Sequence, residues 1–129
     1  MTKWNEELNT GNHEIDSHHK ELFHLDSLLD NAVQSGQLKP VNDIIIFLEH
    51  YVIEHFQEEE DLMTQNDYKG YDHHKNEHEE FKIVVGQLRK RFDDNFPTAH
   101  VIFQTRRILD DLVRHIKRVD VGIRHLDTK

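Results

Sequence analysis

The chain has 129 residues, no cysteine and a formal net charge of −9 with histidine neutral. This length suits one domain spanning residues 1–129. The lack of cysteine excludes disulfides, iron–sulfur clusters and cysteine-based zinc sites. The negative net charge disfavours nucleic acid and anionic membranes as partners. No apolar run reaches the roughly 20 residues of a membrane span, and the N-terminus has no signal-peptide pattern, so a cytoplasmic protein is expected.

Glycine and proline divide the chain into an N-terminal arm and four predicted helices of roughly 20 residues each. The breaks fall at 35–37, at 66–70 and at 93–97, and the second and fourth helices begin near Pro40 and Pro97. Proline suits the first turn of a helix because its missing N–H would have no partner there. Short loops make neighbouring helices antiparallel, so the expected fold is all-α: an up-down-up-down antiparallel four-helix bundle with an N-terminal arm.

Each predicted helix carries apolar residues three and four positions apart, which is the spacing of one helix face. In chain order the four series are Leu22, Leu25, Leu29 and Val33; Val41, Ile45, Leu48, Val52 and Leu62; Phe81, Val85, Leu88 and Phe92; and Val101, Ile108, Leu112 and Val119. These faces are predicted to meet in a common core.

Histidine is unusually frequent, with 12 residues, so the question is whether these side chains form a metal site or lie on the surface. Several of them continue the apolar faces and are therefore predicted to point into the core: His19, His55, His74, His78 and His115, together with Glu59. Burying such groups without partners costs several kcal/mol each. A shared metal centre would satisfy all of them at once.

The pairs His55/Glu59 and His74/His78 have the spacing of four residues that lets both members reach one centre. His73 and Glu77 have the same spacing, but their helix face is polar. That pair is therefore predicted to be exposed.

Two positions stay open at this point. His18 adjoins His19, and Asp120 lies five residues after His115, which is about 140° around a regular helix. Asp120 would turn toward the core only if the helix loosens or ends near residues 116–119.

The ordered series resembles the hemerythrin family over nearly the whole chain. The matching segments are Trp4 and Gly11 in the arm, the sequence IDSHHK at 15–20, HFQEE at 55–59, Tyr71, HKNEH at 74–78, Phe81, and HIKRVD at 115–120. The resemblance selects His19 over His18 as the first ligand and adds Asp120 as the last.

The resemblance also implies a non-haem centre of two Fe ions with a bridging oxo or hydroxo group. By this likeness one iron is held by His74, His78 and His115, the other by His19 and His55, and Glu59 and Asp120 bridge them. The second iron keeps an open position, where dioxygen is expected to bind.

In this family a leucine at the position of Leu112 borders the oxygen pocket, and Phe23 and Phe56 are further predicted lining residues. Ordinary core packing is the alternative interpretation of all three. The family often has a tryptophan just before this leucine, where the present chain has Asp111. That difference concerns the oxygen affinity and the autoxidation rate rather than the iron ligands.

The expected function is therefore reversible dioxygen binding, for transport, storage or sensing, by a protein that is not an enzyme. Imidazole and carboxylate ligands suit ferrous iron, and an open coordination position suits a small ligand. Azide or other small anions and nitric oxide are expected as further ligands, and an oxygen-consuming enzyme or a reductase as a partner. The alternatives are a di-iron enzyme that reduces peroxide, oxygen or nitric oxide, and an iron-storage bundle.

Overall fold

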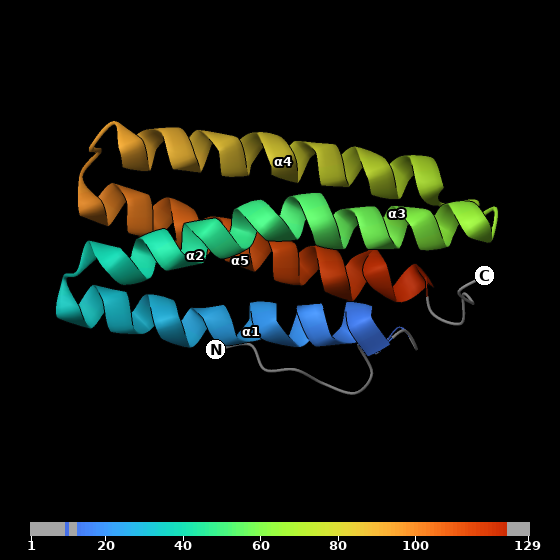
Figure 1. Ribbon diagram of the computed structural model, residues 1–129, viewed down its shortest axis with the longest axis horizontal. Helices are drawn as coiled ribbons and strands as arrows, with labels where there is room; N and C mark the ends of the chain where they lie inside the picture. Colours follow the sequence, from blue (N-terminus) through green and yellow to red (C-terminus); the bar gives the residue numbers. More distant parts are fainter. Residues whose placement is uncertain (1–9, 11–12, 124–129) are drawn as a thin grey trace.

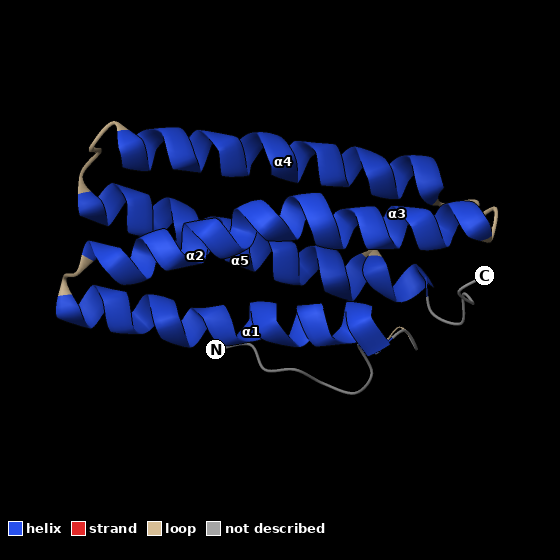
Figure 2. Ribbon diagram, in the orientation of Figure 1, coloured by secondary structure: helices blue, strands red, loops and turns tan. Residues whose placement is uncertain are grey.

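A computed structural model of the chain describes residue 10 and residues 13–123 (Figure 1). The helices are α1 (His13–Ser35), α2 (Leu38–His50), η2 (Tyr51–His55), α3 (Phe56–Gln65), α4 (Tyr71–Asp93), α5 (Thr98–Arg118) and η3 (Asp120–Ile123). No strand occurs in the described part of the chain (Figure 2). The predicted all-α bundle is confirmed, with α2, η2 and α3 forming one continuous helix.

The helix ends coincide with the breaks predicted from glycine and proline. Gly36, at φ +69°, follows α1, and its N–H donates to the carbonyl of Ala32 at 2.9 Å. This left-handed residue closes the helix in a way that glycine allows at little cost. Pro40 lies in the first turn of α2, and Pro97 immediately precedes α5. The chain therefore turns sharply enough for neighbouring helices to pack side by side.

The second long helix contains a π-turn, η2, that was not predicted from the sequence. It spans Tyr51–His55, so one of the predicted ligands lies at its end. A π-turn widens the helix locally, and such turns occur often at functional sites. Tyr51, Val52 and His55 are all buried in this turn, so the wider turn still presents its inner side chains to the bundle.

Two apolar clusters fill the interior. The larger one draws on α1, α2, η2, α3, α4 and α5, whereas the smaller one contains Ile15, Leu62, Met63 and Ile123. Along α1, His19 lies between Ile15 of the smaller cluster and Leu22 of the larger one, and along the continuous helix Glu59 lies between Phe56 and Leu62 in the same way. A polar layer therefore lies between two apolar ones, which keeps water away from it.

The predicted core faces are largely confirmed, but Phe81, Phe92 and Val119 are only partly buried and one predicted residue is exposed. Val33 is 52% exposed, and Ala32 is buried in its place. Near the end of α1 the inward face follows a step of three residues from Leu29 to Ala32 rather than the step of four to Val33. Among the described helices, none combines the length and the apolar character needed to cross a membrane.

Candidate metal centre

The six predicted ligands whose side chains are described are all buried, although each is polar. None is more than 3% exposed: His19, His55, Glu59, His74, His78 and His115. They come from α1, from the continuous helix of η2 and α3, from α4 and from α5. The helical phase of the sequence thus brings together residues that are up to 96 positions apart, from position 19 to position 115.

Glu59 lies at the middle of this cluster, with its two oxygens facing different histidines. Oε2 is 3.2 Å from Nε2 of His19 and 3.4 Å from Nε2 of His55. Oε1 is 3.1 Å from Nε2 of His78 and 3.5 Å from Nε2 of His74. A carboxylate placed in this way can serve two neighbouring cations, one through each oxygen.

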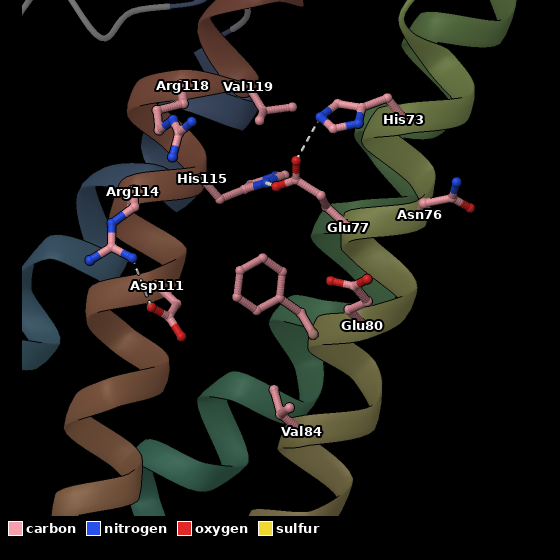
Figure 3. A pocket seen from close by; sticks show the side chains of 11 residues that line it. His73, Asn76, Glu77, Glu80, Val84, Asp111, Arg114, His115, Arg118 and Val119 are labelled. Carbon is pink, nitrogen blue, oxygen red and sulfur yellow. Dashed lines mark hydrogen bonds and ion pairs between the residues drawn. The ribbon is translucent and has the colours of Figure 1, made fainter.

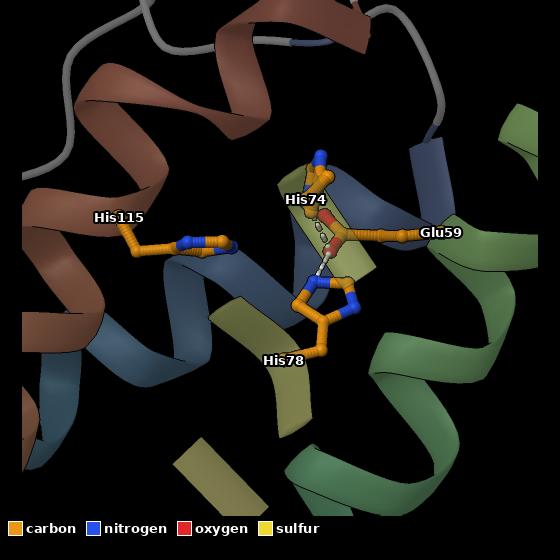
Figure 4. Close-up of side chains that lie close together, drawn as sticks. All are labelled: Glu59, His74, His78 and His115. Atoms are coloured by element: carbon orange, nitrogen blue, oxygen red, sulfur yellow. Dashed lines mark ion pairs between the residues drawn. The ribbon is translucent and has the colours of Figure 1, made fainter. Parts of the chain in front are cut away.

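The ligand atoms form two overlapping sets that share Glu59. We call His74, His78 and His115 the three-histidine half, and His19 and His55 the two-histidine half. In each half the ligand atoms, with one from Glu59, lie within 4.8 Å of one another. Figure 4 shows the three-histidine half with Glu59: the imidazole of His115 extends from α5 toward the residues of α3 and α4.

Two buried atoms of the cluster indicate that it suits a cation. Nε2 of His78 and Oε1 of Glu59 are 3.1 Å apart, yet neither makes a hydrogen bond. A buried acceptor or donor without a partner costs free energy. Imidazole nitrogen and carboxylate oxygen are ligands for iron and related transition metals, so the residues present fit a metal that would satisfy both atoms.

The charge state of Glu59 also favours a cation. Burial alone would raise the pKa of this carboxyl, but the charge of His55 and the imidazoles of His19, His55 and His74 beside its oxygens outweigh burial. Together they hold the pKa of Glu59 well below its usual value. Glu59 is therefore a carboxylate anion at neutral pH, which is the form that binds a metal.

Glu60, the neighbour of Glu59, supports the three-histidine half from outside. Nδ1 of His78 donates to Oε2 of Glu60 at 2.8 Å, and Nζ of Lys75 donates to Oε1 at 2.8 Å. Burial would raise the pKa of Glu60, but hydrogen bonds from Lys75 and His78 outweigh it and lower this pKa. Glu60 was not among the residues predicted from the sequence. The one available signal is that Glu60 adjoins Glu59 on the inward face of α3.

Glu77 has the same role for His115, which corrects part of the earlier interpretation. His73 is exposed as predicted, with 75% of its side chain accessible, but Glu77 is only 28% exposed. Nδ1 of His115 donates to Oε1 of Glu77 at 2.8 Å. Because α5 packs beside α4, a position that is polar on the isolated helix is covered by the neighbouring helix.

His18 is not a member of either half but contacts one. Its Nδ1 lies 3.0 Å from Nδ1 of His55 and 3.4 Å from Oε2 of Glu58. Nε2 of His55 faces Glu59, so His18 reaches the outer side of the His55 ring. His18 therefore contacts the cluster from outside, whereas His19 belongs to it.

Asp120 begins η3 immediately beyond the end of α5. The expected end of the regular helix near residues 116–119 is confirmed, because α5 ends at Arg118 and Val119 has φ −117°. The side chain of Asp120 lies outside the described part of the structure, so its role as a ligand stays a prediction.

The three predicted lining residues are all buried in the larger apolar cluster: Phe23, Phe56 and Leu112. The ring of Phe56 stacks on the ring of His78, with centroids 3.8 Å apart, so Phe56 lies against the three-histidine half. A role of these side chains in an oxygen pocket stays a prediction.

A groove of about 720 Å³ lies between α4 and α5, next to the three-histidine half (Figure 3). His115 and Glu77 form part of its wall, and Asp111 and Arg114 lie along α5. Arg114 and Asp111 approach to 3.4 Å. The groove therefore lies where the resemblance would place a tryptophan instead of Asp111.

The chain is similar in sequence to known proteins of one family. Residues 10–122 match the family profile described as the Hemerythrin HHE cation binding domain. The bacteriohemerythrin of Pseudomonas paraeruginosa is 36% identical over 89 residues, which is 69% of this chain and 58% of that protein. The match therefore spans less than two thirds of that relative. The bacteriohemerythrin of Methylococcus capsulatus is 32% identical over 106 residues, covering 81% of this chain and 79% of that protein. The myohemerythrin of Sipunculus nudus is 31% identical over 117 residues, covering 91% and 86%. No solved structure gives a significant match.

Proposed function

Because the chain belongs to the hemerythrin family, we propose that it binds dioxygen reversibly at an iron centre. The observation that carries this proposal is the position of Glu59, whose two oxygens each face a separate set of histidines. One carboxylate shared by two sets of imidazoles suits a pair of metal ions better than a single ion.

We propose that two irons are held by seven side chains. The three-histidine half would hold one iron, the two-histidine half the other, and Glu59 and Asp120 would bridge them with an oxo or hydroxo group. A pair of ferrous ions, when bound, supplies the electrons that reversible dioxygen binding requires. The ligand set is rich in neutral imidazoles, in contrast to the glutamate-rich sets of the ferritin-like bundles. This difference favours binding of oxygen over its use as an oxidant.

The protein's own contribution would be a dry and rigid surround. The apolar clusters on both sides of the polar layer exclude water. Leu112 precedes His115 by one helical turn and is fully buried, so it is proposed to border the oxygen pocket, with Phe23 and Phe56 as further lining. Azide, other small anions and nitric oxide are proposed as competing ligands, a reductase or an oxygen-consuming enzyme as a partner, and the cytoplasm as the location.

The test is iron analysis combined with optical spectra of the reduced protein under nitrogen, in air and after evacuation. We expect two irons per chain and an oxygenated spectrum that disappears under vacuum and returns in air. Rapid oxidation with turnover of peroxide or nitric oxide would identify an enzyme instead. Spectra that neither oxygen nor azide changes would indicate an iron-storage bundle and contradict the proposal.

A matched pair of histidine variants tests the site itself. His78→Ala removes a buried member of the three-histidine half, whereas His50→Ala removes an exposed histidine whose ion-pair partner is Glu54 at 3.7 Å. The first variant should lose iron, and the second should keep both irons and the reversible spectrum.

A further inference from the structure

We infer that Glu60 and Glu77 are positioning residues that make the three-histidine half the tighter of two metal positions, the first to fill and the last to empty. The inference rests on the proposed two-metal centre, and it adds an order of loading to it. It follows from the outer contacts of the ligand rings, which differ between the two halves.

Each of the two carboxylates fixes one ligand ring in the orientation that a metal needs. Glu60 accepts the Nδ1 proton of His78, and Glu77 accepts that of His115, both at 2.8 Å. An imidazole that donates through Nδ1 carries its lone pair on Nε2, which here faces the interior. A carboxylate acceptor also makes the ring a stronger metal ligand.

The two carboxylates are themselves held in place by residues of α4. Nζ of Lys75 donates to Glu60 at 2.8 Å, and Nε2 of His73 lies 2.8 Å from Oε2 of Glu77 (Figure 3). Two ligands and three of their supporting residues thus lie within residues 73–78 of α4. Because these residues lie on one helical segment, the helix sets their relative positions whenever it is formed.

His55 of the two-histidine half has an outer contact of a different kind. Nδ1 of His55 faces Nδ1 of His18 at 3.0 Å, and an imidazole carries no negative charge with which to polarise the His55 ring. Hydrogen bonds to a charged partner are roughly twice as strong as neutral ones. With two histidines rather than three, this half is expected to bind its metal more weakly.

The test is a stepwise titration of the metal-free protein with Co²⁺, a spectroscopic probe that does not require oxygen to be excluded. We expect two steps of one ion each. Glu60→Gln and Glu77→Gln should each weaken the first step by about 10- to 100-fold and speed the release of that ion to a chelator. Glu77→Asp, which keeps the charge, should restore part of the loss. His18→Gln should change the second step only.

Glu80→Gln is the matched control, because Glu80 is an exposed carboxylate on the same helix and the same groove. It should leave both steps unchanged. Circular dichroism of each metal-free variant tests whether it folds, and Glu77→Gln, which alters a partly exposed residue, decides the outcome if Glu60→Gln does not fold.

The inference is overturned if Glu77→Gln leaves the first step unchanged, or if His18→Gln weakens that step as much. Two equal and independent steps in the unaltered protein would also overturn it, while leaving the two-iron function intact. Binding of a single ion would contradict the two-iron function. Because the inference concerns the order in which two positions fill, that result would overturn it as well.

Discussion

The ring of Phe56 lies almost parallel to the ring of His78, with an angle of 5° between them and centroids 3.8 Å apart. On its outer side the same imidazole donates to Glu60. His78 is therefore fixed by a ring face and by a hydrogen bond, and each can be removed separately.

Phe56→Leu tests the ring contact. Loss of the stacked ring and of some apolar contact should lower the free energy of unfolding by about 1–2 kcal/mol, measured by denaturant unfolding of the metal-free protein. Phe103→Leu is the control, because Phe103 is 68% exposed, and should change stability by less than about 0.5 kcal/mol. Equal effects of the two variants would contradict a packing role for Phe56.

His74→Ala tests the link between metal binding and folding. The variant should lose metal, and with it the stabilisation of about 2–3 kcal/mol that a ligand at 100 times its dissociation constant provides. Thermal unfolding with and without Fe²⁺ measures this difference. We expect a metal-dependent rise in Tm in the unaltered protein and in His50→Ala, but not in His74→Ala. Two irons retained after loss of both His74 and His78 would refute the assignment of these ligands.

Asp26→Asn tests a partly buried carboxyl outside the proposed ligand set. Burial raises the pKa of Asp26, with a further rise from Asp110 that Arg106 opposes. A carboxyl with a raised pKa in the folded state costs no stability below its ordinary value of 3.8. The cost appears as the pH rises through the raised value and is complete above it.

The asparagine variant should therefore be more stable than the unaltered protein at pH 7, and this advantage should shrink as the pH falls toward 4 or below. Urea unfolding at a series of pH values measures the change. Asp61→Asn is the control, because Asp61 is exposed and accepts a hydrogen bond from Gln57 at 2.8 Å. A constant advantage at all pH values would show that charge is not the cause.

Asp111→Trp tests the groove between α4 and α5. A large ring at this position should fill space beside His115, so that a chelator removes metal from the three-histidine half several-fold more slowly. Stopped-flow release to a chelator measures the rate. Lys117→Trp places the same ring on an exposed part of α5 that does not line the groove and should leave the rate unchanged. Equal rates in all three proteins would show that the groove is not a route to the centre.

The helical repeat explains why much of the site was predictable from the sequence. His55, Glu59, His74 and His78 follow the apolar faces of their helices, so an inward direction could be assigned without knowing how the helices pack. The turns were also predictable, because glycine and proline act on the backbone locally, whichever helices pack together.

The remaining features depend on which helices are neighbours, and a single periodic pattern does not contain that information. Glu77 was placed on the surface because its own helix face is polar, but α5 covers it and His115 bonds to it. Glu60 was missed because its partners, Lys75 and His78, belong to another helix. Val33 was placed inside because steps of three and four residues are both compatible with one helix face.

The distribution of buried side chains along α4 bears on how the molecule opens. The buried residues of α4 are His74, His78, Val85 and Leu88, so its fully buried apolar side chains lie in its second half, whereas Tyr71 and Phe81 in the first half are only partly buried. The first half is held at its buried face by imidazoles that are proposed to bind metal. In the metal-free protein this half should therefore unfold locally at lower cost than the rest, and its amide protons should exchange fastest. Over about three helical turns, bound metal would stabilise the first half of α4 as apolar packing stabilises its second half. This segment would then unfold only when the whole bundle unfolds.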